Sequence, residues 1–563
     1  MTVEEKAGQM YHGRDIPGRG DETRGMVKDN LMTHFVYSGG ISDTDAFIDW
    51  HNELQALALN STRLGIPITI STDPQHGWTQ DGGTSNVGLS FSRWTEPMGL
   101  AALRSPEMTF AYGDVVRQEL SAVGVRQVLY PQVDLATEPR WGRTGLTMGE
   151  DANLTSTLLI EILRGFQKTE EVGIESIVAT VKHFPGAGPM QDGEDAHFPW
   201  GKWQVYPGNN SEYHMVPFKA AISRGVPQIM PYYSLPKGTE WEETGFAFSK
   251  EVITGLLKEK LGFKGIVLTD FGILTMTPWG VEDKTELERT QLAIDAGCDI
   301  IGGESSTQLT IELVTSGAIK EDRINESVRK LLRQKFELGL FDKPFADKNL
   351  AKAVLAKEEF TRLGNETQRR SFTLLTNKNN LLPLPRAARR AKIYAEGIDK
   401  SVLEQRGLTL TDDPDNADYA FLRLASPRRQ PDGSDLAAVL INNGTLEFNS
   451  TEQARQKEIY SAVPTIVDIK FNRPAAIPEV AEQAAALMGS YGSSHDAFLD
   501  VVFGIDGWAP EGKLPFDMPR SMKAVEESFE DLPFDTKDPL FRFGNGLQYD
   551  TKPCARRPHS MRS

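Results

Sequence analysis

The segment KGIVLTD at residues 264–270 shows the pattern that decides the fold of this chain. It is a short apolar run that ends directly in an acid, Asp270. Strands that are buried on both faces of a parallel sheet have continuous apolar runs of this kind. Five similar runs predict further strands: IPITIST (66–72), VLYPQVDL (128–135), SIVATV (176–181), VPQIMPYY (226–233) and CDIIGG (298–303).

Longer amphipathic segments separate these runs and have the spacing of helices that cover a sheet. Several of them stop at a glycine, as helices often do at their C-terminus. Alternation of strands and helices over more than 250 residues predicts an α/β fold, specifically a (β/α)8-type TIM barrel. The predicted helices span 107–124, 154–168, 249–262, 285–297 and 319–341.

A change in composition near residue 377 predicts a second unit. Residues 377–390, NKNNLLPLPRAARR, are polar, contain proline and are typical of a linker. Beyond them the alternation resumes, with predicted strands at 391–397, 418–424 and 464–471 and predicted helices at 452–463, 480–488 and 495–504. We therefore expect a barrel domain at 1–376, an α/β sandwich domain at 391–549 and a disordered tail at 550–563.

Composition excludes several classes of protein. The 563 residues include 61 Lys and Arg against 78 Asp and Glu, a net charge of −17, which argues against nucleic acid or an anionic membrane as a partner. No apolar stretch approaches the length of a membrane-spanning helix. The two cysteines, Cys298 and Cys554, exclude a disulfide framework. Because nucleotide and zinc motifs are absent, we expect neither a cofactor nor a metal.

The sequence contains more N-x-[ST] sequons than the two or three expected by chance. One interpretation is a glycosylated, secreted protein whose leader has been removed, since the segment MTVEEKAGQMYHG has no apolar signal region. The other is chance occurrence in a chain that is not exported. The sequon asparagines are Asn60, Asn153, Asn209, Asn325, Asn365, Asn443 and Asn449.

Polar side chains follow five of the predicted barrel strands. A single polar residue after a strand is usually a turn or a helix cap, but reacting groups of a barrel also lie at this end of the strands. Five such positions, with two acids and a Lys-His pair among them, predict a pocket. The residues are Asp73, Arg140 and Arg143, Lys182 and His183, Tyr233, and Asp270.

These side chains suit a neutral, polyhydroxylated ligand, because carboxylates, Lys, Arg and His all form hydrogen bonds to hydroxyl groups. Tryptophans near the same segments offer apolar faces on which sugar rings stack, or they are ordinary core aromatics. They are Trp141, Trp200, Trp203 and Trp279.

Five ordered motifs make the chain resemble glycoside hydrolase family 3, over nearly its whole length. They are GIPITISTDPQHG, EPRWGR…GED, KHFPGAG, KGIVLTDFG and KLPFDMPRS…FRFGNGLQY. The resemblance implies a barrel followed by an α/β sandwich, an active site at their interface, a carbohydrate substrate and hydrolysis with retention of anomeric configuration.

The resemblance also implies roles for individual residues. Asp270 matches the nucleophile, in a T-D-F rather than the usual S-D-W context, so Phe271 replaces a tryptophan. Tyr233 matches a tyrosine near that nucleophile. The residues that match the subsite for the non-reducing sugar are Asp73, Arg143, Lys182 and His183.

The general acid/base is left open. Many β-glucosidases of the family use a glutamate of the second domain, but the corresponding stretch 426–444 contains no Glu, and its candidates are Asp432, Asp435 and, just beyond, Glu447. The N-acetylglucosaminidase branch uses a His with an Asp, which Asp195 and His197 resemble at a spacing two residues longer. An alternative for Asp195 is sugar binding.

The leading prediction is a retaining, exo-acting β-glycosidase, with glucose preferred at the non-reducing end. β-Xylosidase and β-N-acetylhexosaminidase activity on the same scaffold are alternatives. A catalytically weak carbohydrate-binding protein is the alternative from another class, since the expected second-domain Glu is missing.

Overall fold

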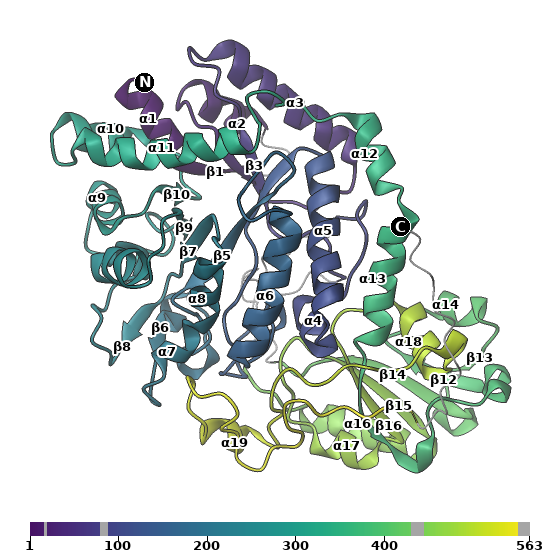
Figure 1. Ribbon diagram of the computed structural model, residues 1–563. Helices are drawn as coiled ribbons and strands as arrows, with labels where there is room; N and C mark the ends of the chain where they lie inside the picture. Colours follow the sequence, from purple (N-terminus) through teal and green to yellow (C-terminus); the bar gives the residue numbers. More distant parts are fainter. Residues whose placement is uncertain (16–19, 79–87, 429–443, 550–563) are drawn as a thin grey trace.

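The computed structural model describes residues 1–549 apart from 16–19, 79–87 and 429–443. Its first part is a closed barrel of parallel strands in the order β1-β10-β9-β7-β5-β4-β3-β2 (Figure 1). The barrel predicted from the sequence is therefore confirmed. Its strands are β1 (Tyr11–Asp15), β2 (His34–Tyr37), β3 (Thr69–Thr72), β4 (Val125–Val128), β5 (Val178–Phe184), β7 (Gln228–Pro231), β9 (Ile266–Phe271) and β10 (Ile300–Gly302).

The predicted strands differ from the observed ones where the side chains are polar or where proline intervenes. The sequence pattern missed β1, YHGRD, because its polar residues interrupt any apolar run. It missed β2 because HFVY is only four residues long. The run at 128–135 is not a strand: β4 ends at Val128, and the prolyl residue Pro131 has no N–H for a sheet ladder.

Helices surround the barrel on its outside (Figure 1). Several begin at a capping side chain: Ser105 accepts a hydrogen bond from the N–H of Met108, and Asp151 accepts one from Leu154. Four of the five predicted barrel helices agree with observed ones within two residues at each end, although the one at 249–262 has π-helical hydrogen bonding. The helix predicted at 319–341 ends four residues earlier, at Glu337. The observed helices are α5 (Pro106–Ala122), α6 (Ala152–Gln167), the π-helix Glu251–Lys260, α9 (Glu286–Ala296) and α11 (Glu321–Glu337).

Other barrel helices complete the layer. They are α1 (Val3–Gln9), α2 (Gly20–Lys28), α3 (Thr44–Ser61), α4 (Pro97–Leu103), α7 (Ser211–His214), α8 (Val216–Ser223), α10 (Thr307–Thr315), α12 (Lys348–Leu355) and α13 (Glu358–Arg370). A small two-stranded sheet pairs β6 (Trp203–Val205) with β8 (Leu235–Lys237). Its two strands follow the barrel strands β5 and β7 in the chain.

The second part of the chain is a six-stranded mixed sheet in the order β11-β16-β15-β14-β12-β13. All neighbours are parallel except β11, which pairs antiparallel with β16. Helices flank this sheet, as the predicted α/β sandwich requires. Its strands are β11 (Thr373–Asn377), β12 (Lys392–Glu396), β13 (Thr409–Thr411), β14 (Tyr419–Ala425), β15 (Thr465–Lys470) and β16 (Ala486–Ser490). Its helices are α14 (Lys400–Gln405), α16 (Ser450–Ala462), α17 (Pro478–Gln483), α18 (His495–Val502) and α19 (Met522–Glu526).

Two expectations for this region need correction. The helix predicted at 480–488 ends at Gln483, and Ala486–Ser490 form strand β16, fully buried in the sheet. The apolar segment was short enough to fit either state. The chain also enters the second sheet at Thr373, in β11, before the predicted end of the barrel domain at 376. The other predicted domain limits stay predictions, and the tail at 550–563 lies outside the described residues.

A buried carboxylate joins the barrel to the C-terminal segment of the chain. Glu150 lies in the loop before α6, and its oxygens accept hydrogen bonds from the backbone N–H of Asp517 (2.5 Å) and Phe534 (2.8 Å). Burial raises the pKa of Glu150 to about 8, although the two N–H donors lower it. A direct backbone bond from Glu96 N to Tyr491 O (2.8 Å) ties a barrel loop to the second sheet.

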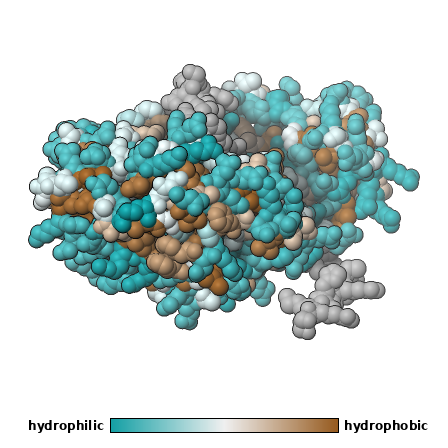
Figure 2. Space-filling model, turned by 90° about the horizontal axis from the view of Figure 1, so that it is seen from above, coloured by the Kyte–Doolittle hydropathy of each residue, from teal (hydrophilic) through white to brown (hydrophobic). Residues whose placement is uncertain are grey.

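The surface seen from above, over the helices at the top of Figure 1, is mostly hydrophilic with small groups of hydrophobic residues (Figure 2). Within the described ranges, no helix is both long and apolar enough to cross a membrane.

Candidate active site

A pocket of about 470 Å³ lies at the carboxyl ends of the barrel strands. Most of the residues that the sequence predicted for a site meet here, although they come from separate strands. It is lined by Arg14, Val36, Ser38, Asp73, Leu129, Arg143, Lys182, His183, His197, Met230, Tyr233, Asp270 and Phe271.

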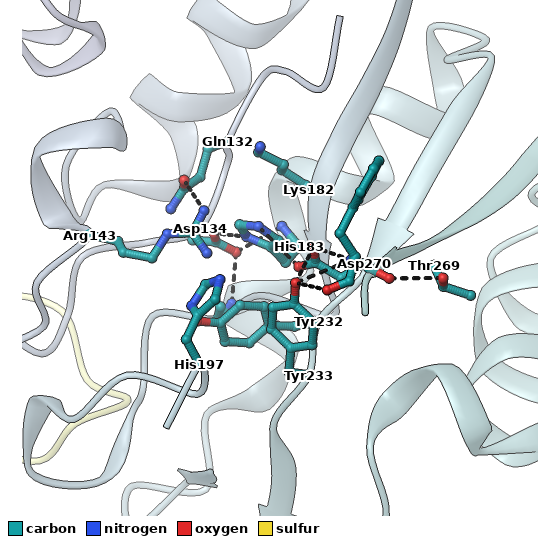
Figure 3. Close-up of polar contacts among 12 residues, drawn as sticks. Gln132, Asp134, Arg143, Lys182, His183, His197, Tyr232, Tyr233, Thr269 and Asp270 are labelled. Atoms are coloured by element: carbon teal, nitrogen blue, oxygen red, sulfur yellow. Dashed lines mark hydrogen bonds and ion pairs between the residues drawn. The ribbon is translucent and has the colours of Figure 1, made fainter. Parts of the chain in front are cut away.

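Asp270 is held at the end of β9 with one oxygen bound and the other unbound. Its Oδ1 accepts hydrogen bonds from the Tyr233 hydroxyl (2.7 Å) and from the backbone N–H of Phe271 (2.8 Å). Its Oδ2 is buried and has no hydrogen-bond partner in the described part of the chain. The side chain is 11% exposed and borders the pocket. One oxygen of Asp270 is thus oriented by the protein while the other is available to a ligand (Figure 3).

His183 lies between two carboxylates, Asp134 and Asp270 (Figure 3). Asp134 Oδ2 lies 2.7 Å from His183 Nδ1, and Asp134 Oδ1 accepts the backbone N–H of His183 and of Ala187. His183 Nε2 lies 3.6 Å from Asp270 Oδ2. Burial, and then the charge of Arg143, lower the pKa of His183 well below its ordinary value. The imidazole is therefore neutral, with Nδ1–H donating to Asp134 and Nε2 left as an acceptor toward the pocket.

Two cations complete the floor of the pocket. Lys182 Nζ donates to Asp73 Oδ1 at 3.0 Å, which fixes both side chains. Arg143 is only 1% exposed, and one of its nitrogens donates to Gln132 Oε1 at 3.2 Å. Its Nε and Nη1 have no hydrogen-bond partner among the described side chains and backbone. Buried unpaired donors are costly, so Arg143 is arranged to receive acceptor atoms that a ligand supplies.

His197 forms a second His–Asp pair, with Asp195, on the loop that follows β5. Its Nδ1 lies 2.5 Å from Asp195 Oδ1, and its backbone N–H donates to the same oxygen at 3.0 Å. Burial alone would raise the pKa of Asp195, but the charge and hydrogen bonds of His197 hold it below its ordinary value. The His197 side chain is 30% exposed and lines the pocket, with its ring 4.9 Å from that of Tyr233.

Two of the four tryptophans fit the second interpretation, that of core aromatics, and support this loop. Trp141 is fully buried, and its indole N–H donates to Asp195 Oδ2 at 3.1 Å. The buried Trp279 donates to the backbone oxygen of Ala196 at 2.7 Å. Neither Trp200 nor Trp203 is among the described residues that line the pocket: Trp200 is 57% exposed and stacks on Phe198, and Trp203 lies near two lysines.

Other predicted residues lie away from the pocket or outside the described ranges. Arg140 pairs with Glu138 at 2.8 Å and with Asp192. Glu447 accepts the N–H of Met522, the first residue of α19, at 2.8 Å, and it is not one of the described residues that line the pocket. Asp432 and Asp435 fall within 429–443 and lie outside the described residues, so their roles stay predictions.

The sequence reading missed several residues of the site. Asp134 belongs to the run at 128–135, and an acid near the end of an apolar run is the signal that identified Asp270. Arg14 lies in β1 and Ser38 follows β2, two strands that the pattern did not predict. Gln132 orients Arg143, and no sequence signal distinguishes it from other polar loop residues.

The arrangement combines the elements needed to open an acetal. A carboxylate with a free oxygen, Asp270, can attack a carbon atom. An imidazole that reaches the pocket and is oriented by an acid, His197, can carry a proton. The neutral His183, the cations Lys182 and Arg143, and Asp73 can bind hydroxyl groups around the reacting carbon.

Comparison with known proteins agrees with this chemistry. The model of the glycosyl hydrolase family 3 N terminal domain matches residues 2–334. A probable β-glucosidase C of Aspergillus flavus is 50% identical over 575 residues, which cover 99% of this chain and 90% of that protein. A periplasmic β-glucosidase/β-xylosidase of Dickeya chrysanthemi is 34% identical, over 98% of this chain and 88% of that protein. The structure of a β-glucosidase from Erythrobacter marinus superposes with a TM-score of 0.82 at 20% identity, covering 98% of this chain and 82% of that one.

Proposed function

Because the chain belongs to glycosyl hydrolase family 3, we propose that it is a retaining, exo-acting β-glucosidase that removes terminal β-glucosyl residues from the non-reducing end of its substrates. The relatives named β-glucosidase support glucose as the sugar. The observation that carries the mechanism is Asp270, whose Oδ1 is bound by Tyr233 while its buried Oδ2 is unpartnered at the pocket.

In the first step Asp270 Oδ2 attacks the anomeric carbon of the bound sugar. A C–O bond forms to the carboxylate as the bond to the leaving oxygen breaks, and a covalent glycosyl-enzyme results. The hydrogen bonds from Tyr233 and from Phe271 N hold the carboxylate in place. An oriented nucleophile lowers the entropy cost of reaching the transition state.

We propose His197 as the general acid/base. Its Nδ1–H donates to Asp195, which leaves Nε2 to protonate the leaving oxygen and later to take a proton from the attacking water. The negative charge of Asp195 stabilises the imidazolium that carries this proton. Trp141 and Trp279 support the role indirectly, because both bond to the 195–197 segment and hold it still.

The remaining polar groups bind the sugar before and during attack. Two loops, which carry Asp73 and Arg143, and strand β5, which carries Lys182 and His183, converge on the same pocket. Their hydrogen bonds to sugar hydroxyls would be completed as the ring flattens toward the transition state, so they contribute to catalysis as well as to binding. Phe271 offers the apolar face beside Asp270.

We further propose that the protein acts outside the cytoplasm. Fungal and periplasmic relatives support this location. So does the accessibility of the sequons: in the described ranges Asn60, Asn153, Asn209 and Asn449 are exposed, and Asn325 and Asn365 are half-buried. Asn443 lies outside the described residues. Peptide mass mapping before and after deglycosylation of the secreted protein tests occupancy.

The activity is tested with p-nitrophenyl β-glucoside, β-xyloside and β-N-acetylglucosaminide, with the product anomer followed by NMR at early times. We expect the glucoside to be hydrolysed fastest and β-glucose to appear before mutarotation. Preference for the xyloside or the N-acetylglucosaminide would assign the alternative specificity. Sugar binding without turnover of any of the three would identify a binding protein instead.

A further inference from the structure

A second pocket, of about 510 Å³, lies at the carboxyl ends of the parallel strands of the second sheet. Among its lining residues are Arg423 and Ala425 at the end of β14, Asp468 on β15, Ser493 before α18, and Trp78, which comes from the barrel loop after β3. It is therefore shared between the two parts of the chain.

The pocket lies where the order of the strands reverses. From β12 the chain goes to β13 on one side, and from β14 it goes to β15 on the other, so the connections diverge between β12 and β14. Gly397, immediately after β12, lines the pocket, and a side chain there would collide with Arg423 O at 2.0 Å. In open α/β sheets such a switch point forms a crevice that binds ligands.

One lining group of this pocket, the carboxylate of Asp468, has an oxygen left to accept a hydrogen bond from a ligand. Arg423 already binds Asp468 Oδ2 (2.8 Å), the Ser493 hydroxyl (2.8 Å) and His495 Nδ1 (3.0 Å). Asp468 is 1% exposed, and its Oδ1 has no hydrogen-bond partner in the described structure. A free carboxylate oxygen repels an anion and accepts a hydroxyl group.

Trp78 adds an apolar face to these polar groups. Its indole ring is half-buried and lies 5.0 Å from the Arg93 guanidinium. Its Cβ lies 3.1 Å from the position that a Cβ on Gly492 would occupy, so Trp78 lies close to the residues that follow β16. An aromatic face beside a carboxylate that accepts hydroxyl protons is chemistry suited to a sugar ring.

The loop that carries Trp78 connects this pocket to the candidate active site. Asp73 lines the catalytic pocket, Pro74 and Gly77 line a small cavity that also touches Lys182, and Trp78 lines the second pocket. Five residues of chain span at most about 18 Å. An oligosaccharide of a few units that begins in the catalytic pocket can therefore reach Trp78.

We propose that the pocket bounded by Trp78, Ala425 and Asp468 binds a glycosyl unit on the leaving-group side of a β-linked oligosaccharide, so that longer gluco-oligosaccharides are preferred over aryl glucosides. This inference rests on the proposed function and adds its substrate class. Asp468 Oδ1 accepts a sugar hydroxyl, and the indole of Trp78 covers a ring face.

Two variants test the pocket in different ways. Ala425→Trp fills it from an exposed position without removing a native contact, and Trp78→Ala removes the aromatic face. Thr409→Trp, an exposed substitution on β13 at the edge of the same sheet, is the matched control. The measured quantity is the ratio of kcat/KM for cellotriose to kcat/KM for p-nitrophenyl β-glucoside, repeated with laminaritriose.

We expect this ratio to fall roughly 5- to 30-fold in Ala425→Trp and Trp78→Ala, the range for losing one stacked or hydrogen-bonded ring, and to be unchanged in the control. An unchanged ratio in both pocket variants would overturn the proposal. If the wild type hydrolyses no aryl glucoside, the proposed function fails; calorimetric binding of the two trisaccharides then tests the pocket by itself, and equal affinity for wild type and Ala425→Trp would refute it.

Discussion

The candidate active site in the barrel contains two His–Asp pairs that have similar local geometry but different surroundings. His183 is fully buried between Asp134 and Asp270, and burial keeps its pKa far below the ordinary value. His197 pairs with Asp195 at a similar distance, but 30% of its side chain is exposed at the pocket. The comparison teaches that the acid partner alone does not make a histidine a proton carrier. Access to solvent and substrate decides which imidazole can exchange a proton.

Replacing Asp270, the nucleophile that lines the same pocket as both pairs, should have the largest effect on kcat. Asp270→Ala removes the nucleophile, and kcat should fall roughly 10³-fold or more. The fold should persist, because the side chain borders the pocket and makes few packing contacts. Steady-state kinetics and circular dichroism test this together. A folded variant that keeps more than a tenth of wild-type activity would contradict the assignment of Asp270.

Removing His197 from the partly exposed His197–Asp195 pair should slow turnover, and azide should restore it. His197→Ala should lower kcat by about 10²-fold or more for a glucoside with a poor leaving group. With dinitrophenyl β-glucoside, which needs little protonation, the glycosyl-enzyme should accumulate, and azide should release it as β-glucosyl azide. Asp195→Asn keeps the ring and should give a smaller loss.

Near-normal turnover of a poor leaving group by His197→Ala, without azide rescue, would show that His197 is not the acid/base. The same assay on Asp432→Ala and Asp435→Ala would then identify a donor in the segment that follows β14. Rescue in one of those variants would move the proton transfer to the second part of the chain.

Breaking the buried pair should weaken sugar binding without affecting proton transfer. His183→Ala should lower kcat/KM by about 10- to 100-fold, since one acceptor for a sugar hydroxyl is lost, and azide should not restore it. Because the pKa of His183 is lowered in the folded state, the unfolded state binds more protons below about pH 6.5. The free energy of unfolding of the wild type should therefore decrease as the pH is lowered below about 6.5, and it should decrease less steeply in His183→Ala.

The smallest effect should come from Glu447, which caps α19 rather than lining the pocket. Glu447→Gln retains an oxygen that can accept the Met522 N–H, so kcat/KM should change by less than about twofold. A large loss of kcat/KM that azide restores would show that Glu447, and not His197, is the acid/base, and would place it on the second part of the chain.

The sequence predicted the part of this site that depends on strand ends. Asp73, Lys182, His183, Tyr233 and Asp270 follow or end apolar runs, and barrel closure brings them together as the pattern required. The pattern could not predict Arg14 and Ser38, because β1 is polar and β2 is short.

The sequence could not distinguish core from surface tryptophans either. Trp141 and Trp279 are buried because their N–H groups reach acceptors on the 195–197 loop, a contact that depends on tertiary packing. The same limit made Ala486–Ser490 look like the end of a helix: its burial in the middle of a sheet, between β11 and β15, is not visible in a short apolar run.

Glu150 makes the stability of the contact between the barrel and the C-terminal segment depend on pH, so that this contact weakens as the pH rises. Its pKa is about 8 in the folded chain and about 4.3 when unfolded, so the folded state holds an extra proton between these values and loses stability as pH rises through them. Asp517 and Asp535 add repulsion once the proton leaves. In calorimetry at alkaline pH the second part of the chain should therefore melt ahead of the barrel, and Glu150→Gln should return the two parts to a single transition.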